Sequence, residues 1–227
     1  MAVYKSLIRR FAPPSPGGRR AISKVIPLPP GEGAPKGRVR DLQSAVPISY
    51  SSSMPHVIEP ASSGRAKCRG CARSIASGTL RFGERLPNPF GDGEMTLWFH
   101  PVCAAYKRPE PLLEVLGETP EAVSDREQLE RIAQRGLTQR RLPRIDGAER
   151  SPGRMAKCRH CKTPIEKGAW RVRLVFYEEG MFTPGGFVHL TCRNDYFETH
   201  DVIDQVLHFS SELSDDDRAD LRRASDS

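Results

Sequence analysis

The sequence predicts an α+β protein of two small zinc-stapled domains that follow a disordered tail. Three observations predict this class: two sets of Cys-x2-Cys and His-x2-Cys pairs, an internal repeat around them, and a hydrophobic fraction of only 37%. In a chain of 227 residues, so few apolar side chains favour two small domains over one larger core. Domains of this size usually need a metal ion or disulfides for stability.

The first 57 residues form the predicted tail. They contain nine of the 20 prolines, and runs such as residues 13–18 cannot sustain a packed core. Residues 1–60 hold nine Lys and Arg against three Asp and Glu, so the tail is basic. One interpretation is an arm that adds non-specific attraction to phosphate. A merely solvated tail, a translation start placed too early and a transit peptide are the alternatives.

An internal repeat organises the remaining chain. Residues 66–71, Ala-Lys-Cys-Arg-Gly-Cys, recur as residues 156–161, Ala-Lys-Cys-Arg-His-Cys. Beyond the second cysteine of each copy, Ile, Gly and Arg follow at the same three offsets. The repeat predicts one domain over residues 58–116 and a second over residues 146–227.

Hydrophobic patterns predict strands in both copies and a short helix between them. Residues 170–174 alternate with period two, and residues 80–82 do so briefly, which indicates strands. In the linker, residues 117–145, the capping box of residues 124–127 starts a helix that Gly136 is expected to end.

Two further helices are predicted near the end of the chain. Val202, Ile203, Val206 and Leu207 have helical spacing. Residues 214–217, Ser-Asp-Asp-Asp, are expected to start a last helix that ends in two arginines. Acidic residues at the start and basic residues at the end suit the helix dipole, so this acidic run needs no functional explanation.

The cysteine and histidine pairs predict two structural zinc sites. Zinc favours a tetrahedron of Cys and His ligands, and each pair of motifs offers four. The predicted ligands are Cys68, Cys71, His100 and Cys103 in the first site and Cys158, Cys161, His189 and Cys192 in the second. Four protein ligands leave no position for a reactive water. An iron-sulfur cluster or disulfides are alternatives, but the same mixed ligand set occurs twice, which favours two zinc ions per chain.

The use of every cysteine in these sites indicates a reducing, intracellular protein. Residues 1–11 contain three basic side chains and no apolar run long enough for a secretory signal core or a membrane span. We therefore expect an intracellular monomer that does not bind membranes.

These motifs resemble the zinc fingers of the poly(ADP-ribose) polymerase type, known from those polymerases, a DNA ligase and a DNA-end processing enzyme. The resemblance rests on residues 63–68, on Trp-Phe-His at residues 98–100, on the long spacer between ligand pairs and on residues 209–214. It implies a small antiparallel sheet with helices around each zinc. It also implies recognition of DNA strand breaks by shape, through backbone contacts and base stacking.

The resemblance also implies DNA contacts at particular positions. In the first finger, Arg65 and Arg81 match phosphate-contacting arginines, while Phe90 and Met95 occupy the places of a base-stacking pair. Without the resemblance, Phe90 and Met95 would be read as core residues. In the second finger the corresponding candidates are Arg154, Arg171, Met181 and Phe182.

The second finger departs from the family pattern. Arg154 is displaced by one residue, a phenylalanine replaces the tryptophan before the histidine, and Glu178 and Glu179 would repel phosphate. These departures make the second finger the weaker candidate for DNA binding and leave a protein-facing role open.

The predicted function is therefore a non-enzymatic, zinc-dependent DNA-binding protein that recognises strand breaks or ends with tandem fingers and lacks a catalytic domain. No nucleotide-binding loop and no nucleophile paired with a base is evident in the sequence. A protein-interaction adaptor, or the targeting subunit of a separately encoded DNA repair enzyme, is the alternative. The excess of 15 acidic over 12 basic residues in residues 145–227 favours the adaptor.

Overall fold

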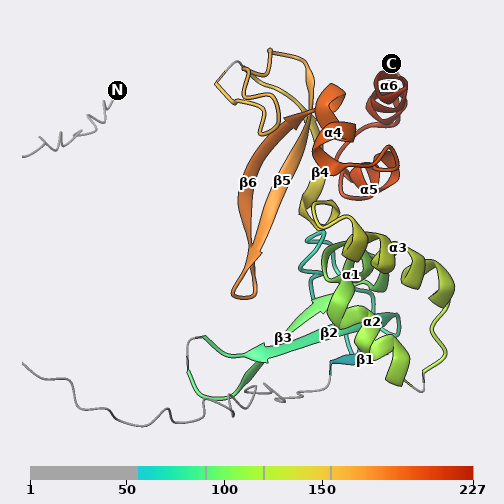
Figure 1. Ribbon diagram of the computed structural model, residues 1–227. Coiled ribbons are helices and arrows are strands. Elements are labelled where there is room, and N and C mark those ends of the chain that lie inside the picture. The colour runs from blue at the N-terminus through green and yellow to red at the C-terminus, as the bar shows by residue number, and fades with distance from the viewer. Residues whose placement is uncertain (1–55, 90, 120, 154, 227) are drawn as a thin grey trace, which may run out of the picture. The chain divides into compact units, whose positions relative to one another are not determined.

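The computed structural model describes residues 56–89, 91–119, 121–153 and 155–226. The predicted tail, residues 1–57, lies almost wholly outside this part of the chain. Two three-stranded antiparallel sheets, each accompanied by helices, make up the described fold (Figure 1). The predicted α+β class with two zinc-stapled units is confirmed. Across these ranges, every helix is too short or too polar to cross a lipid bilayer.

The first sheet has the strand order β1-β2-β3. Its strands are β1 (Val57–Pro60), β2 (Leu80–Pro87) and β3 (Glu94–Phe99), and three helices follow, α1 (Pro101–Lys107), α2 (Pro109–Glu118) and α3 (Arg126–Thr138). Phe82 of β2 and Phe99 of β3 are fully buried against the helices, together with Leu112 and Leu116 of α2. This apolar core forms one face of the small sheet, as an antiparallel sheet with one solvated face requires.

The helix predicted in the linker is present as α3, with different ends. It begins after Asp125, which adopts a left-handed conformation with φ 58°, and no side chain caps it. Gly136 lies inside the helix, where a Cβ atom would come within 3.3 Å of Pro109 Cγ. Leu129 and Ala133 are buried in the first core, so tertiary packing rather than the capping box decides the position of this helix.

The second sheet repeats the order of the first, as β4-β5-β6. A short 3-10 turn, η1 (Leu142–Arg144), precedes the strands β4 (Ile145–Arg150), β5 (Trp170–Glu178) and β6 (Met181–His189). In the two-residue turn between β5 and β6, Glu179 has φ 49° and Gly180 has φ 80°. These values suit a type I′ turn, whose twist matches that of a hairpin. The result is a long β5–β6 hairpin (Figure 1).

The helices of the second unit follow the hairpin. They are η2 (Leu190–Cys192), α4 (Arg193–Phe197), α5 (Ile203–His208) and α6 (Asp215–Ser225). Ser214 caps α6, since its side chain accepts a hydrogen bond from the Asp217 backbone N–H. Acidic residues occupy the first turn of α6, and Arg222 and Arg223 occupy the last. The predicted start and basic end of this helix are confirmed.

Residues of the second unit complete the core of the first. Phe209, directly after α5, is buried within the first core, and Tyr177 and Phe182 of the hairpin pack against it. The Phe182 ring meets Phe99 edge-on at 6.4 Å between centroids. The two repeats therefore share apolar contacts.

Gly147 makes a close backbone approach possible at the start of the second unit. It has φ 93° and lies in the irregular part of the β4–β5 ladder. A Cβ atom at this position would lie 2.4 Å from the carbonyl oxygen of Phe209. Only glycine therefore fits between β4 and the segment that follows α5.

Replacing Gly147 with alanine is expected to destabilise the fold by about 2–4 kcal/mol, because both the positive φ and the backbone overlap penalise a side chain. Urea unfolding of the zinc-loaded chain measures this change. Gly117→Ala is the control, since Gly117 lies in α2 with open space around its Cα. That substitution should be neutral or slightly stabilising, and equal losses for both variants would contradict the explanation.

Candidate metal centres and nucleic-acid interface

The first metal centre joins a turn, a strand end and a helix start. Cys68 and Cys71 lie on a turn that Ala72 closes in a left-handed conformation, donating its N–H to the Cys68 carbonyl at 2.8 Å. His100 directly follows β3, and Cys103 lies in α1. The four ligand atoms all lie within 4.8 Å of one another. The repeat predicted this cluster correctly.

The second centre reproduces the first. Cys158 and Cys161 lie on a turn closed by Lys162 with φ 66°, and Lys162 donates its N–H to the Cys158 carbonyl at 3.0 Å. His189 ends β6 and Cys192 ends η2. The backbone N–H of each histidine donates to the first cysteine sulfur of its site, at 3.4 Å in the first centre and 3.3 Å in the second. Such bonds orient the ligands and stabilise thiolates.

The interatomic distances fit tetrahedral zinc. In a tetrahedral site with Zn–S bonds of about 2.3 Å and Zn–N bonds of about 2.0 Å, the ligand nitrogen and sulfur atoms lie about 3.5 Å apart. His100 Nδ1 lies 3.5 Å from Cys71 Sγ and 3.9 Å from Cys103 Sγ, and His189 Nδ1 lies 3.4 Å from Cys161 Sγ and 3.9 Å from Cys192 Sγ. Both clusters therefore fit a zinc ion. Three thiolates and one imidazole fill its four coordination positions, so no position is left for a catalytic water.

Hydrogen bonds and burial within the two clusters shift the pKa values of their ligands in both directions. Hydrogen bonds from Cys103 and then Cys68 hold the pKa of Cys71 far below that of a free thiol. Hydrogen bonds with Cys68 and then Cys71 raise the pKa of His100 to about 10. In the second centre, a hydrogen bond with Thr163 lowers the pKa of Cys161 to about 6. A hydrogen bond with Cys68 raises the pKa of Cys103, and burial raises that of Cys192. Each cluster thus holds one thiolate and retains other protons, and zinc binding must release these protons from the ligands.

One residue of the second finger reaches the first metal centre. His208 of α5 places its Nε2 atom 3.2 Å from Cys103 Sγ. When Cys103 is a thiolate ligand, this nitrogen donates to the sulfur. A donor that bonds to a metal ligand in this way fixes the orientation of that ligand. No sequence pattern predicted this contact, because His208 and Cys103 are 105 residues apart.

Two predicted phosphate contacts, Arg81 and Arg171, are buried and paired within the protein. Arg81 is 8% exposed, pairs with Glu59 at 2.6 Å and lies over the Trp98 ring at 3.5 Å. Arg171 is 7% exposed, pairs with Glu149 and lies over a phenylalanine ring at 3.7 Å. The glutamate lies 22 residues before the arginine in both fingers, so a longer repeat alignment would have found the pair. Phosphate contact by either arginine stays a prediction.

The other predicted DNA contacts lie in different environments. Arg65 is exposed just before the first cysteine, and Met181 is 51% exposed at the hairpin tip. Met95 is half-buried and approaches Gly180, where a Cβ atom would lie 2.5 Å from its terminal methyl group. Phe182 packs against the first core. Phe90 and Arg154 lie outside the described residues.

The predicted stacking loops of the two fingers meet around one hollow. Leu86, Pro87, Pro89 and Met95 of the first finger line it, together with Tyr177, Glu179 and Gly180 of the hairpin. Its volume is about 520 Å³. The first finger's loop and the second finger's hairpin tip, far apart in the sequence, therefore border a single apolar opening.

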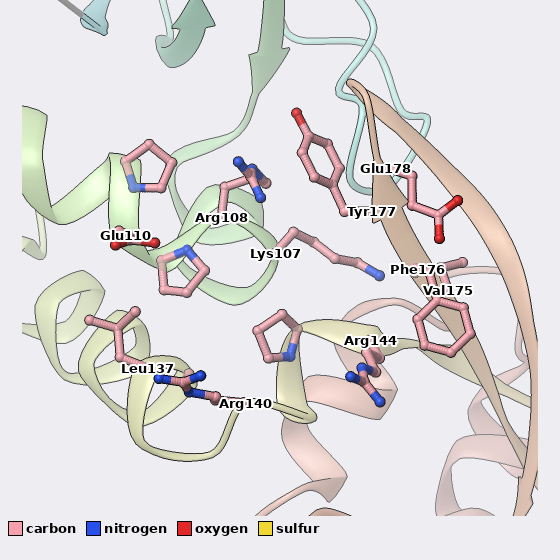
Figure 2. A pocket seen from close by; sticks show the side chains of 14 residues that line it. Lys107, Arg108, Glu110, Leu137, Arg140, Arg144, Val175, Phe176, Tyr177 and Glu178 are labelled. Atoms are coloured by element: carbon pink, nitrogen blue, oxygen red, sulfur yellow. The ribbon is translucent and has the colours of Figure 1, made fainter. Parts of the chain in front are cut away.

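Buried charges tie the two fingers together beside a wider cleft. Lys107 at the end of α1 donates to the Ile145 carbonyl at 2.5 Å and to Asp146 at 3.2 Å, and its side chain is 1% exposed. Burial lowers the pKa of this amine, and the Asp146 carboxylate opposes the shift. Fourteen residues line the adjacent cleft of about 660 Å³, and Figure 2 shows Arg144 next to Phe176 in its wall.

A second buried pair lies close by. Glu84 of β2 is 1% exposed and accepts several hydrogen bonds from Arg108, including one at 2.8 Å. Tyr177 of the second finger donates its hydroxyl to the same carboxylate at 3.3 Å. The Arg108 guanidinium also lies 3.7 Å from the Tyr177 ring centre. Neither Lys107 nor Glu84 was predicted from the sequence, because no local sequence pattern identifies a charged side chain that becomes buried between the repeats.

Substituting one ligand is expected to remove one zinc ion. Cys161→Ser should lower the zinc content from two ions per chain to one, because serine is a poor ligand for zinc and the two centres have separate ligands. Elemental analysis of the purified chain measures this ratio. His160→Ala, which changes a neighbouring residue outside the ligand set, should retain both ions. Two zinc ions in Cys161→Ser would overturn the assignment.

Removing the Lys107 amine is expected to weaken the contact between fingers. Lys107→Met keeps most of the apolar stem but leaves the Ile145 carbonyl without this donor, so the free energy of unfolding should fall by about 1–3 kcal/mol. Urea denaturation tests the change, with the exposed Lys67→Met as control. Equal stability of the two variants would contradict a structural role for the Lys107 amine.

Comparison with known proteins agrees with the architecture. Residues 59–140 match the family model described as the poly(ADP-ribose) polymerase and DNA-ligase Zn-finger region. The chain is 27% identical over 195 residues to a poly [ADP-ribose] polymerase of Drosophila melanogaster, covering 75% of this chain and 19% of that protein. It is 41% identical over 56 residues to poly [ADP-ribose] polymerase 1 of Caenorhabditis elegans, covering 25% of this chain and 6% of that protein.

The chain thus spans about a fifth of the Drosophila melanogaster relative it matches. The match of residues 59–140 runs from β1 through α3 and includes the whole first metal centre. The second finger repeats the same ligand set, sheet order and arginine–glutamate pair. Residues 59–140 therefore match the zinc fingers of the poly(ADP-ribose) polymerase type, and the second finger repeats their ligand pattern.

Proposed function

We propose that this chain recognises DNA strand breaks or ends with its paired fingers and has no catalytic activity of its own. The zinc-finger family and the two metal centres support a zinc-dependent DNA-binding module. The observation that carries break recognition is the apolar hollow shared by the first finger's loop and the hairpin tip. An intact duplex keeps its bases stacked inside, whereas a break frees a terminal base to stack on apolar side chains.

The hollow has the composition that a stacking platform needs. Met95, Leu86 and Pro89 offer apolar surface, and Tyr177 offers an aromatic side chain. Base stacking on such groups is tolerant of sequence, because every base has two flat faces. Met181 follows Gly180 at the tip and is 51% exposed, so it adds apolar surface next to a residue that lines the hollow. The proposed site therefore reads an exposed base end without reading its identity.

Arginine side chains would supply the positive charge that attracts the DNA phosphates. Arg65 is exposed and directly precedes the first metal centre, so its guanidinium is available to a phosphate. Arg81 and Arg171 would contribute through the edges that their glutamate partners leave free. Binding that depends on phosphate contacts falls with salt, so any measured preference for breaks must be compared at one ionic strength.

The adaptor remains a second candidate because of one specific finding. The carboxylates of Glu59 and Glu149 already pair with Arg81 and Arg171, as expected if these arginines only stabilise the fold. In that case the fingers would be scaffolds, and the chain would bring a separately encoded repair enzyme to its site. DNA binding by the purified chain separates the two candidates.

Truncating the exposed methionine at the hairpin tip is expected to reduce break preference. Met181→Ala should lower the ratio of affinities for nicked and intact duplex about tenfold, since loss of one stacking contact costs about 1–3 kcal/mol. Fluorescence anisotropy with two otherwise identical duplexes measures the ratio. Leu137→Ala is the matched control, because Leu137 is an exposed apolar residue of α3 and does not lie at the hairpin tip.

Two outcomes would contradict this proposal. Equal affinity of the unaltered chain for nicked and intact DNA would reject break recognition. A ratio that falls equally in Met181→Ala and Leu137→Ala would reject the hairpin tip as the place where the broken end is read.

A further inference from the structure

The two Cys-x2-Cys turns, residues 68–72 and 158–162, face different surroundings. In the first finger this turn borders the second finger, because Arg69 and Ala72 line a hollow whose opposite wall includes Phe182 and Phe209. In the second finger the corresponding turn is exposed from Arg159 through Lys162. The first turn is therefore partly covered, since Gly70 is buried and Cys71 is half-buried, whereas the second turn is exposed throughout residues 159–162.

The open copy carries basic residues that the covered copy lacks. His160 and Lys162 stand where the first finger has Gly70 and Ala72. With Arg159, they line a hollow of about 300 Å³ whose other wall is formed by Arg141 and Arg144 at η1. Four permanent cations and an imidazole therefore surround one small opening.

Aromatic rings hold these cations without neutralising them. Arg144 and Arg159 both lie over the Phe176 ring, at 5.0 Å and 5.5 Å from its centre, and Arg141 lies 5.2 Å from the Tyr196 ring centre. Arg159 also donates to the Gly185 carbonyl at 2.8 Å. Rings and carbonyls orient a guanidinium while leaving its net charge in place.

The acidic groups near this hollow do not cancel its charge. Arg141 pairs with Glu198 at 3.2 Å, and His160 pairs with Asp195 at 3.8 Å when protonated. These two carboxylates are 67% and 75% exposed, so water screens them. Within the described ranges, no carboxylate pairs with Arg144, Arg159 or Lys162. Three cations are therefore available to an external anion.

We infer that this basic hollow of the second finger, lined by Arg144, Arg159 and Lys162, binds phosphate groups of the DNA backbone beside the break. The inference rests on the proposed function for its choice of DNA as the ligand. Three fixed cations on one polar surface suit consecutive phosphates better than bases, which need flat apolar faces. Arg144 and Phe176 also border the cleft of Figure 2, where Arg140 adds a further cation.

This surface assigns different tasks to the two fingers. The hollow around Met95 would hold the exposed base, whereas the second finger's turn would hold the intact backbone next to it. Contacts to backbone alone carry no sequence or break information. Losing them should therefore weaken binding to nicked and intact duplex by the same factor.

The test removes two of these cations from the full zinc-loaded chain. Arg144→Gln combined with Lys162→Gln is compared with Arg131→Gln combined with Arg222→Gln, which removes two exposed cations outside the hollow. Affinity for nicked and for intact duplex is measured by anisotropy over a range of salt concentrations. Zinc content and circular dichroism confirm that both variants are folded.

The expected result is a loss of about tenfold in affinity for both duplexes, with a salt slope reduced by about two, because each lost phosphate contact contributes nearly one to the slope. The ratio between nicked and intact DNA should not change. The control pair should retain the slope of the unaltered chain.

Other outcomes separate the two proposals. If the hollow variant behaves like its control while the unaltered chain prefers nicked DNA, the phosphate surface is rejected and break recognition stands. If the unaltered chain binds both duplexes equally and the hollow variant weakens both, break recognition is rejected and the surface stands. If the unaltered chain binds neither duplex, both proposals are rejected. That result is expected if the basic surface binds an acidic protein instead of DNA.

Discussion

Metal coordination is the constraint on which the rest of this structure depends. Each finger has a sheet of only three strands, and its Cys-x2-Cys turn is tied to the end of the last strand and the helical turn after it through four ligands. That closure fixes the direction in which the helices leave the sheet. In the first finger it thereby sets where the end of α1 meets the second finger. The zinc ions thus organise surfaces and do no chemistry themselves.

Charge burial is the second level of organisation. Lys107 and Glu84 are almost fully buried, yet each meets partners from another segment that satisfy much of its polar requirement. Burying such groups costs more than burying apolar ones, so their value lies in specifying one arrangement. Ile145, Asp146 and Tyr177 accept or contact these charges only when the second finger lies in one position. The hollow around Met95 and the cleft beside Lys107 both depend on that position.

The metal centres and much of the secondary structure could be predicted from sequence because their signals are local or repeated. The ligand spacing identified all eight ligands, and the period-two pattern identified β5. The linker helix was also predicted, and only its ends differ, since α3 continues through Gly136, which packs beside Pro109. The pairing of Arg81 with Glu59 follows from strand register, which the local pattern does not reveal. Contacts such as His208 with Cys103 join residues too distant for any pattern to connect.

Because of the contact between His208 and Cys103, the two repeats form one structural unit and contribute to it differently. The His208 nitrogen supplies a donor to a metal ligand of the other finger, and the adjacent Phe209 fills that finger's core. A first finger cut away from its neighbour would therefore lose a sulfur contact, an aromatic side chain and the acceptors of Lys107 in a single step. Measurements on separated fingers would describe species that the intact chain does not contain. Exchanging the positions of the two repeats would lose the same contacts, although the repeats share one sequence pattern. Each finger supplies side chains that the other finger cannot supply in its place.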